Sequence, residues 1–383
     1  MASKTSFSSK ITLTTIAILL IFPCSSSTPT VPPNTANSRP PHFSKMYAFG
    51  DSYTDTGNTK SNLPYGMTFF HHPSNRLSDG RLVIDFVAET LSLPYLPPYL
   101  DQKNHNTTHG VNFAVSGATA IDHDFYVKNN ITLAGFTPQS IKNELVWFSN
   151  FMEINGCGGR NRKMLSDKCR ALTDDALFWV GQIGANDYLY ALGSSVSSAT
   201  VQDLSVKSVT GVLQALLKMG AKYIVVQGLP MTGCLSLTLT IAPTNDRDEF
   251  GCVASSNKQS YSHNLLLQSV LQDLRKQYPH AVISYADHWN AYRAIMKNQQ
   301  GYGFKESFKA CCGSNIGPYN FEAFAFCGSP RASQPCPNPS QFMIWDGVHL
   351  TESMYKAVAD LFLHRGYLNP SFDALLRSKM SVD

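Results

Sequence analysis

Charged residues are scarce in this chain of 383 residues. Asp, Glu, Lys and Arg make up 15% of it, and the formal net charge is only +4. So mild a balance does not favour nucleic-acid binding. No internal repeat is evident and no shift in composition marks a linker, so we expect one domain rather than two. Glycine and proline are scattered and 43% of the residues are hydrophobic, which excludes collagen-like and disordered classes.

Long apolar runs are also missing, apart from one near the start of the chain. Residues 11–22 form an apolar run that is too short to span a bilayer comfortably. Lys4 and Lys10 precede this run and small residues follow it at 25–27, which is the layout of a secretory signal peptide. We therefore expect residues 1–27 to be removed. A signal anchor that stays in the membrane is the alternative interpretation.

The sequence after this segment divides into two parts of different composition. Residues 28–44 are rich in Pro, Ser and Thr and predict a flexible leader. Residues 45–383 then predict a single domain. We expect a secreted monomer without stable membrane insertion, delivered to the cell exterior or to a vacuole.

The cysteines lack any C-x-x-C pair, so zinc ribbons and thioredoxin-like redox motifs have no support. One of the nine cysteines, Cys24, lies in the signal segment, which leaves an even number for structural disulfides whose pairing the sequence leaves open. The sequons at Asn106 and Asn130 are expected glycosylation acceptors. Histidines at 71–72 and in the segment 121–124 lack metal-ligand spacing, so we expect neither a metal nor another cofactor.

Apolar runs and helical stripes alternate along the chain. Strands are predicted at residues 45–49, 112–115, 177–180, 223–226 and 281–285. Helical spacing of apolar residues predicts helices around 83–91, 209–217, 267–274 and, as a closing element, 355–362. This alternation favours an α/β fold, a three-layer α/β/α sandwich with a central parallel sheet. In such sheets functional groups gather at the carboxyl ends of the strands.

Two of the turns and loops carry candidate catalytic groups. Ser52, in FGDSYTDTGN, follows a predicted strand through a tight Gly-Asp turn, although a turn or cap would explain the same residues. Asp346 and His349, in WDGVHLT, are spaced so that the carboxylate can bond one imidazole nitrogen while the other faces a hydroxyl. A solvated loop is the alternative for that pair.

Two more turns offer donors for an oxyanion. Gly117, in VNFAVSGATA, exposes a backbone N–H without side-chain obstruction, and Asn186, in GQIGANDY, carries an amide that can donate. Taken singly, each is explained as well by turn geometry.

The four segments FGDSYTDTGN, GVNFAVSGATA, GANDY and DGVHLT follow the order of the blocks of the GDSL esterase/lipase family, within the SGNH hydrolases, and the chain resembles a plant secreted member. The resemblance implies a flavodoxin-like sheet with strand order 2-1-3-4-5. It also implies that Ser52 is the nucleophile, His349 the general base and Asp346 its orienting carboxylate. The oxyanion hole would combine the Ser52 N–H with the donors Gly117 and Asn186. Tyr53 stands where the motif's name expects Leu.

The implied activity is that of a serine carboxylic ester hydrolase acting through an acyl-enzyme on a small-molecule or lipid ester of a plant. An acyltransferase that moves an acyl group, for example hydroxycinnamoyl, to an alcohol is the alternative, because water or alcohol can attack the same intermediate. A non-catalytic binder of cell-wall glycans is a further hypothesis.

Overall fold

The computed structural model describes residues 43–131, 137–157, 166–322, 325–332 and 334–380. The expected signal peptide, residues 1–27, and most of the expected leader, residues 28–42, lie outside the described residues. In the described part no helix is long and apolar enough to cross a membrane.

The central feature is a six-stranded sheet in the order β2-β1-β3-β4-β5-β8. Its strands are β1 (Lys45–Phe49), β2 (Gly110–Asn112), β3 (Ala176–Val180), β4 (Tyr223–Gln227), β5 (Val282–Ala286) and β8 (Leu368–Asn369). The first five pair in parallel, with Lys45 opposite Ala176 and Tyr223 opposite Val282, and β8 adds an antiparallel edge. The predicted strand order is confirmed.

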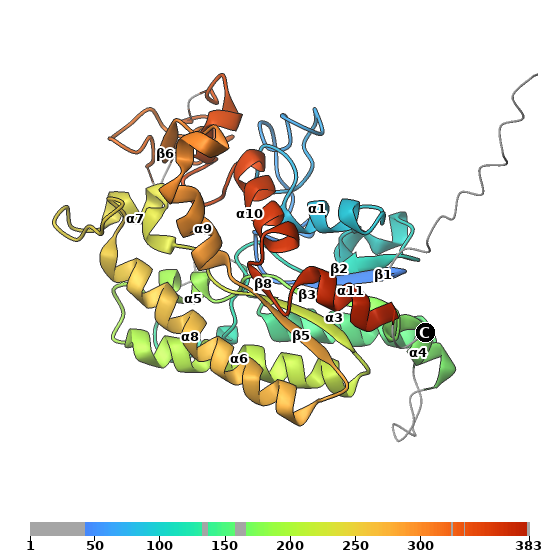
Figure 1. Ribbon diagram of the computed structural model, residues 1–383. Helices are drawn as coiled ribbons and strands as arrows, with labels where there is room; N and C mark the ends of the chain where they lie inside the picture. The colour runs from blue at the N-terminus through green and yellow to red at the C-terminus, as the bar shows by residue number, and fades with distance from the viewer. Residues whose placement is uncertain (1–42, 132–136, 158–165, 323–324, 333, 381–383) are drawn as a thin grey trace, which may run out of the picture. The chain divides into compact units, whose positions relative to one another are not determined.

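Helices cover both faces of this sheet (Figure 1). One face packs on α3 (Ile141–Ile154), α6 (Ser198–Lys218) and α8 (Ala254–Gln277), and the other packs on α1 (Val83–Thr90), α9 (His288–Lys297), α10 (Glu352–His364) and α11 (Phe372–Met380). Shorter helices lie in the connections: α2 (His123–Lys128), α4 (Asp167–Thr173), α5 (Ala185–Tyr190) and α7 (Ser236–Ile241). The predicted three-layer α/β architecture is confirmed.

The period-2 alternation of β1 explains why two cores form. Met46 and Ala48 belong to the core under α1, α9 and α10, whereas Tyr47 and Phe49 belong to the core under α3, α6 and α8. All four side chains are almost completely buried. A strand that is buried on both faces reads as a continuous apolar run, which is the pattern that the sequence shows.

Three elements differ from the predictions. The strand expected at 112–115 is β2 at Gly110–Asn112, although Phe113 and Val115 still donate backbone hydrogen bonds to Ala48 and Gly50. The helix expected to close the chain is α10, and β8 and α11 follow it. The sheet is not purely parallel, because β8 runs antiparallel to β5.

A second, smaller sheet pairs β6 (Glu306–Ala310) with β7 (Phe342–Ile344) in parallel. Two disulfides cross-link the segment between these strands, Cys311–Cys336 and Cys312–Cys327. Two others lie elsewhere, Cys157–Cys169 and Cys234–Cys252. All eight cysteines after the signal segment are therefore paired, as the sequence predicted, and the structure supplies the pairing that the sequence left open.

Candidate active site

Ser52 lies in the turn that follows β1. Gly50 precedes it with φ +135°, a conformation that favours glycine, and its N–H donates to Glu144 Oε2 at 2.8 Å. The backbone N–H groups of Thr54 and Asp55 donate to the carbonyl of Asp51, which closes one tight turn around the serine. Ser52 is 6% exposed, so its hydroxyl sits just below the surface. The glycine and the turn explain why a strand can end so abruptly at a serine.

Asp346 and His349 lie in the loop after β7. Asp346 Oδ1 accepts the backbone N–H groups of Val348 at 3.0 Å and His349 at 2.8 Å, and its Oδ2 bonds His349 Nδ1 at 2.7 Å. Because a carboxylate only accepts hydrogen bonds, the imidazole carries a proton on Nδ1. Gly347, with φ +96°, leaves no room for a side chain, since a Cβ there would stand 2.1 Å from the ring of Phe321.

The pKa of Asp346 lies below its usual range. Burial alone would raise this pKa, but the nearby His349 and the hydrogen bonds from His349 and Tyr65 outweigh burial. Tyr65 is a residue that the sequence analysis missed, and its hydroxyl donates to Asp346 Oδ2 at 2.8 Å. The carboxylate is therefore held in its ionised form, as the partner of an imidazole that gains charge must be.

The loops of Ser52 and His349 contact each other directly. The Tyr53 hydroxyl donates to the carbonyl of Val348 at 2.7 Å, and the rings of Tyr53 and His349 lie 5.9 Å apart. Between the two described residues Ser52 and His349 themselves there is no hydrogen bond, and catalytic hydrogen bonds are often long until substrate binds. Tyr53, the departure from the family motif, thus ties the two loops together.

The two predicted oxyanion donors lie beside the serine turn. Asn186 stands in the first turn of α5, and its Nδ2 donates to the carbonyl of Ala118 at 2.9 Å and to Asp51 Oδ2 at 3.4 Å. Ala118 follows Gly117, whose φ is +81° and whose carbonyl accepts the Tyr190 hydroxyl at 2.9 Å. One amide group therefore bridges the Gly117 loop and the Ser52 turn. The bond to Asp51 is the longer of the two.

Four buried carboxyls support this arrangement, and the sequence analysis named none of them. Burial raises the pKa of Asp51 to about 7 and that of Asp187 to about 6, and it also raises the pKa values of Asp55 and Glu144. Each accepts backbone N–H groups of the site loops, for example Asp187 from Ala120 at 2.8 Å. A sequence signal existed for Glu144, which is a charged residue on the otherwise apolar face of α3.

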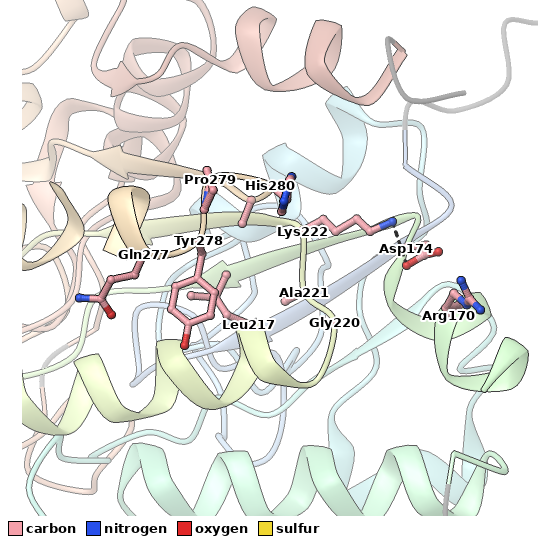
Figure 2. Close-up of a pocket in the computed structure, with 11 residues that line it drawn as sticks. Arg170, Asp174, Leu217, Gly220, Ala221, Lys222, Gln277, Tyr278, Pro279 and His280 are labelled. Atoms are coloured by element: carbon pink, nitrogen blue, oxygen red, sulfur yellow. Dashed lines mark ion pairs between the residues drawn. The ribbon is translucent and has the colours of Figure 1, made fainter. Parts of the chain in front are cut away.

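A cavity of about 520 Å³ lies at the opposite end of the strands, where β4 and β5 begin (Figure 2). Leu217, Lys222 and His280 are among its lining residues, and Lys222 forms an ion pair with Asp174 at 3.1 Å. None of the candidate site residues lines this cavity. Because ligands of open α/β sheets bind at the carboxyl ends of the strands, the chemistry is expected at Ser52 and not here.

Comparison with known proteins agrees with these segments. Residues 46–362 match the family described as GDSL-like Lipase/Acylhydrolase. The chain belongs to this family. A GDSL esterase/lipase of Arabidopsis thaliana is 51% identical over 99% of both chains, and acetylajmalan esterase 2 of Rauvolfia serpentina is 35% identical over 84% of this chain and 90% of its own. This GDSL protein is accordingly a serine ester hydrolase.

Solved structures resemble the GDSL protein only distantly. A catalytic variant of an acetylxylan esterase from Geobacillus stearothermophilus aligns over 88% of this chain and 94% of its own, with 11% identity and a TM-score of 0.38. A likeness of that size says nothing about the substrate or about individual residues of the site.

Proposed function

We propose that this GDSL protein is a secreted plant esterase that works through an acyl-enzyme on Ser52. In this proposal His349 is the general base, Asp346 orients it, and the Ser52 N–H, the Gly117 N–H and the Asn186 amide form the oxyanion hole. The observation that carries the proposal is the hydrogen bond of 2.7 Å between Asp346 and His349. The loop that holds this pair is also bonded by Tyr53, the residue that follows Ser52. Four segments, far apart in sequence, thus supply one set of complementary groups.

In the proposed reaction His349 first accepts a proton and then donates it. His349 Nε2 takes the Ser52 proton as the oxygen attacks the ester carbonyl, and the three donors stabilise the negative oxygen of the tetrahedral intermediate. The bond between the acyl carbon and the alcohol oxygen then breaks, and His349 protonates that oxygen as the alcohol departs. In the second half, water gives a proton to His349 as it attacks the acyl carbon. The bond from that carbon to the Ser52 oxygen then breaks, His349 returns the proton to this oxygen, and the acid leaves.

Secretion is supported by cysteine usage and by the surface of the described residues. Disulfides persist in oxidising compartments, and this chain pairs eight cysteines in four of them. Both predicted glycosylation acceptors, Asn106 and Asn130, are exposed. The name of one relative, acetylajmalan esterase 2, suggests an ester of a small acyl group as substrate.

The experiment compares purified wild-type protein with Ser52→Ala on p-nitrophenyl acetate. We expect the substitution to lower kcat by at least about 10⁴-fold, because it removes the attacking atom. Ser149→Ala serves as the matched control, since Ser149 is exposed on α3 and bonds only its own helix. A fluorophosphonate probe followed by peptide mass spectrometry should label Ser52. Labelling of a different serine, or full activity in Ser52→Ala, would contradict the proposal.

A further inference from the structure

A second pocket, of about 400 Å³, lies between the beginnings of α8 and α9. Aromatic side chains line it: Tyr261 on α8 and Trp289 on α9 have ring centroids 4.9 Å apart, and Phe250 stands on the loop before α8. Tyr261 is 40% exposed and Trp289 is half-buried, so both rings offer surface to a ligand. The pocket is of the size that small ligands occupy in proteins.

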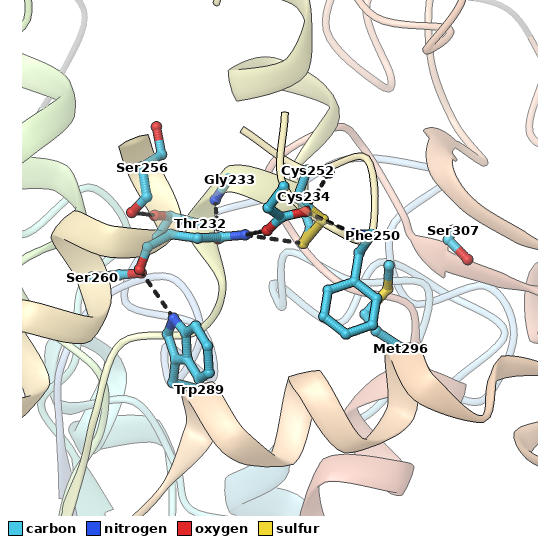
Figure 3. Close-up of a disulfide and its surroundings, with 12 residues drawn as sticks. Thr232, Gly233, Cys234, Phe250, Cys252, Ser256, Ser260, Trp289, Met296 and Ser307 are labelled. Carbon is cyan, nitrogen blue, oxygen red and sulfur yellow. Dashed lines mark hydrogen bonds between the residues drawn. A yellow bond between two sulfur atoms is a disulfide. The ribbon is translucent and has the colours of Figure 1, made fainter. Parts of the chain in front are cut away.

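A disulfide and several hydrogen bonds lie beside this pocket (Figure 3). The disulfide Cys234–Cys252 fixes the loop that carries Phe250, and Asp248 Oδ1 accepts the N–H groups of Phe250 and Cys252 at 2.9 and 3.0 Å. On the opposite side the indole N–H of Trp289 donates to the carbonyl of Asn257 at 3.2 Å, which fixes the ring. The aromatic surfaces are therefore held in place before any ligand arrives, which lowers the entropy lost on binding.

Polar side chains of both signs surround the rings. Arg293 and Glu249 form an ion pair at 2.9 Å, and Lys258 and Asn290 also line the pocket. An acyl chain would not satisfy these groups, and a polyanion would meet the carboxylates of Glu249 and Asp248. A sugar matches the lining, because its C–H groups can pack on the negative faces of aromatic rings while its hydroxyls bond the carboxylate, guanidinium and amide groups.

The pocket lies at the same edge of the sheet as the candidate active site. The walls of the pocket follow β4 and β5, whereas Ser52 follows β1. Because β1 and β5 are three strand spacings apart, their ends are separated by roughly 14 Å. Two contacts connect the regions: the Leu237 N–H donates to the carbonyl of Gly347 at 3.0 Å, and the ring of His288, the neighbour of Trp289, lies 6.1 Å from that of Tyr53. A chain of several sugar units is long enough to span this separation.

We propose that the pocket formed by Phe250, Tyr261 and Trp289 binds a sugar residue of a glycan, and that the ester hydrolysed at Ser52 is carried by the same glycan. The second half of this inference rests on the proposed function. The first half does not, because sugar binding needs no chemistry at Ser52. The two halves can therefore fail separately.

The first test measures binding of xylohexaose, mannohexaose and cellohexaose by calorimetry to the Ser52→Ala protein. We expect at least one of these neutral hexasaccharides to bind. Trp289→Ala and Tyr261→Ala, each made in the Ser52→Ala background, should weaken that binding at least about ten-fold, as removal of a central aromatic anchor does. Val146→Ala, which trims an exposed apolar side chain on α3, is the matched control and should bind unchanged.

The second test uses kinetics in the protein with Ser52 intact. With the acetylated form of the bound hexasaccharide, Trp289→Ala should raise KM about ten-fold at nearly constant kcat, while hydrolysis of p-nitrophenyl acetate stays at the wild-type rate. That unchanged rate also shows that the variant folds, and Tyr261→Ala, at an exposed position, gives a second measure. The inference is wrong if no hexasaccharide binds, or if both aromatic variants bind as tightly as the control. If the wild-type protein did not hydrolyse p-nitrophenyl acetate, the proposed function would instead be wrong.

Discussion

Ser52 and its proposed oxyanion donors stand on loops of the six-stranded sheet, whereas Asp346 and His349 stand on a loop outside it. The sheet side is held by buried carboxyls that accept backbone N–H groups. Glu144 accepts from Gly50, and Asp55 accepts from Gly57 at 2.8 Å and Ser116 at 2.9 Å. These loops leave a deep core, so carboxyls with raised pKa values can be buried behind them.

The other side packs on a smaller buried cluster that includes Trp345 and the disulfide cysteines, and it is also cross-linked. Cys311 and Cys312 begin the disulfide-bonded segment, and their N–H groups donate to the carbonyls of Ile344 at 3.0 Å and Trp345 at 2.7 Å, next to Asp346. A small sheet of two short strands is marginal by itself. We therefore expect the serine side of the site to lose stability as pH rises, because its carboxyls have raised pKa values, and the histidine side to lose stability when its disulfides are removed.

The largest effect expected from this comparison tests the sheet side. Asn186→Ala should lower kcat on p-nitrophenyl acetate by roughly 10²- to 10³-fold with KM little changed, because one oxyanion donor is lost. Circular dichroism should show the fold retained. Asn150→Ala, at an exposed position on α3, is the control. An undiminished rate would remove Asn186 from the site.

The second effect tests the cross-linked side. Replacing Cys312 and Cys327 by Ser opens a loop of 15 residues and should lower the free energy of unfolding by about 3 kcal/mol. The Cys157–Cys169 disulfide closes a loop of 12 residues between α3 and α4, so its removal should cost a similar amount. Only the first pair should also lower kcat, since only it borders the Asp346 loop. Equal kcat values in the two variants would refute this division of roles.

A smaller effect is expected at Tyr65, which we consider a positioning residue. Tyr65→Phe removes one donor from Asp346 Oδ2, so the pKa of Asp346 should rise and the carboxylate should hold His349 less firmly. We expect kcat to fall roughly ten-fold with KM unchanged, as for a lost hydrogen bond to a charged group. Tyr95→Phe is the matched control, because the Tyr95 hydroxyl also donates to a carboxylate, that of Glu89, which lies outside the candidate site. A merely structural role for Tyr65 would change the melting temperature and leave kcat intact.

Much of the sheet side was predictable from the sequence, for a physical reason. Buried parallel strands such as β1 and β3 are apolar runs that end at glycine turns, and the turns themselves carry Ser52 and Asn186. The strand ends that the apolar pattern predicts are therefore also the positions of these candidate site residues. The secondary structure of β6, β7 and β8 was missed, because β6 and β8 contain polar residues and β7 has only three residues, too few to show a readable period.

The supporting contacts were not predictable, because they join distant parts of the chain. Tyr65 lies 281 residues from Asp346, and Glu144 lies 94 residues from Gly50. Nothing in the local sequence of either residue indicates its partner. The same holds for the disulfide pairing, since eight cysteines allow many connectivities.

The last prediction concerns the pH dependence of stability on the serine side, through Glu144. Burial raises the pKa of Glu144 well above its usual value, so the folded protein holds this proton at pH values where the unfolded chain has released it. Its contribution to stability is complete below pH 4.5 and is lost as pH rises toward the folded pKa. Glu144→Gln, which cannot ionise, should therefore gain stability relative to wild type by up to about 1.4 kcal/mol for each pH unit above 4.5.

Urea unfolding at several pH values between 4.5 and 7.5 measures this difference. Glu153→Gln is the control, because Glu153 is exposed on the same helix and should show no pH-dependent gain. The Cys312/Cys327 variant should keep the wild-type pH slope, since its disulfide lies on the other side of the site. If Glu144→Gln followed wild type at every pH, the carboxyl would have to be ionised in the folded protein, and the pH response assigned to the serine side would have no basis at this residue.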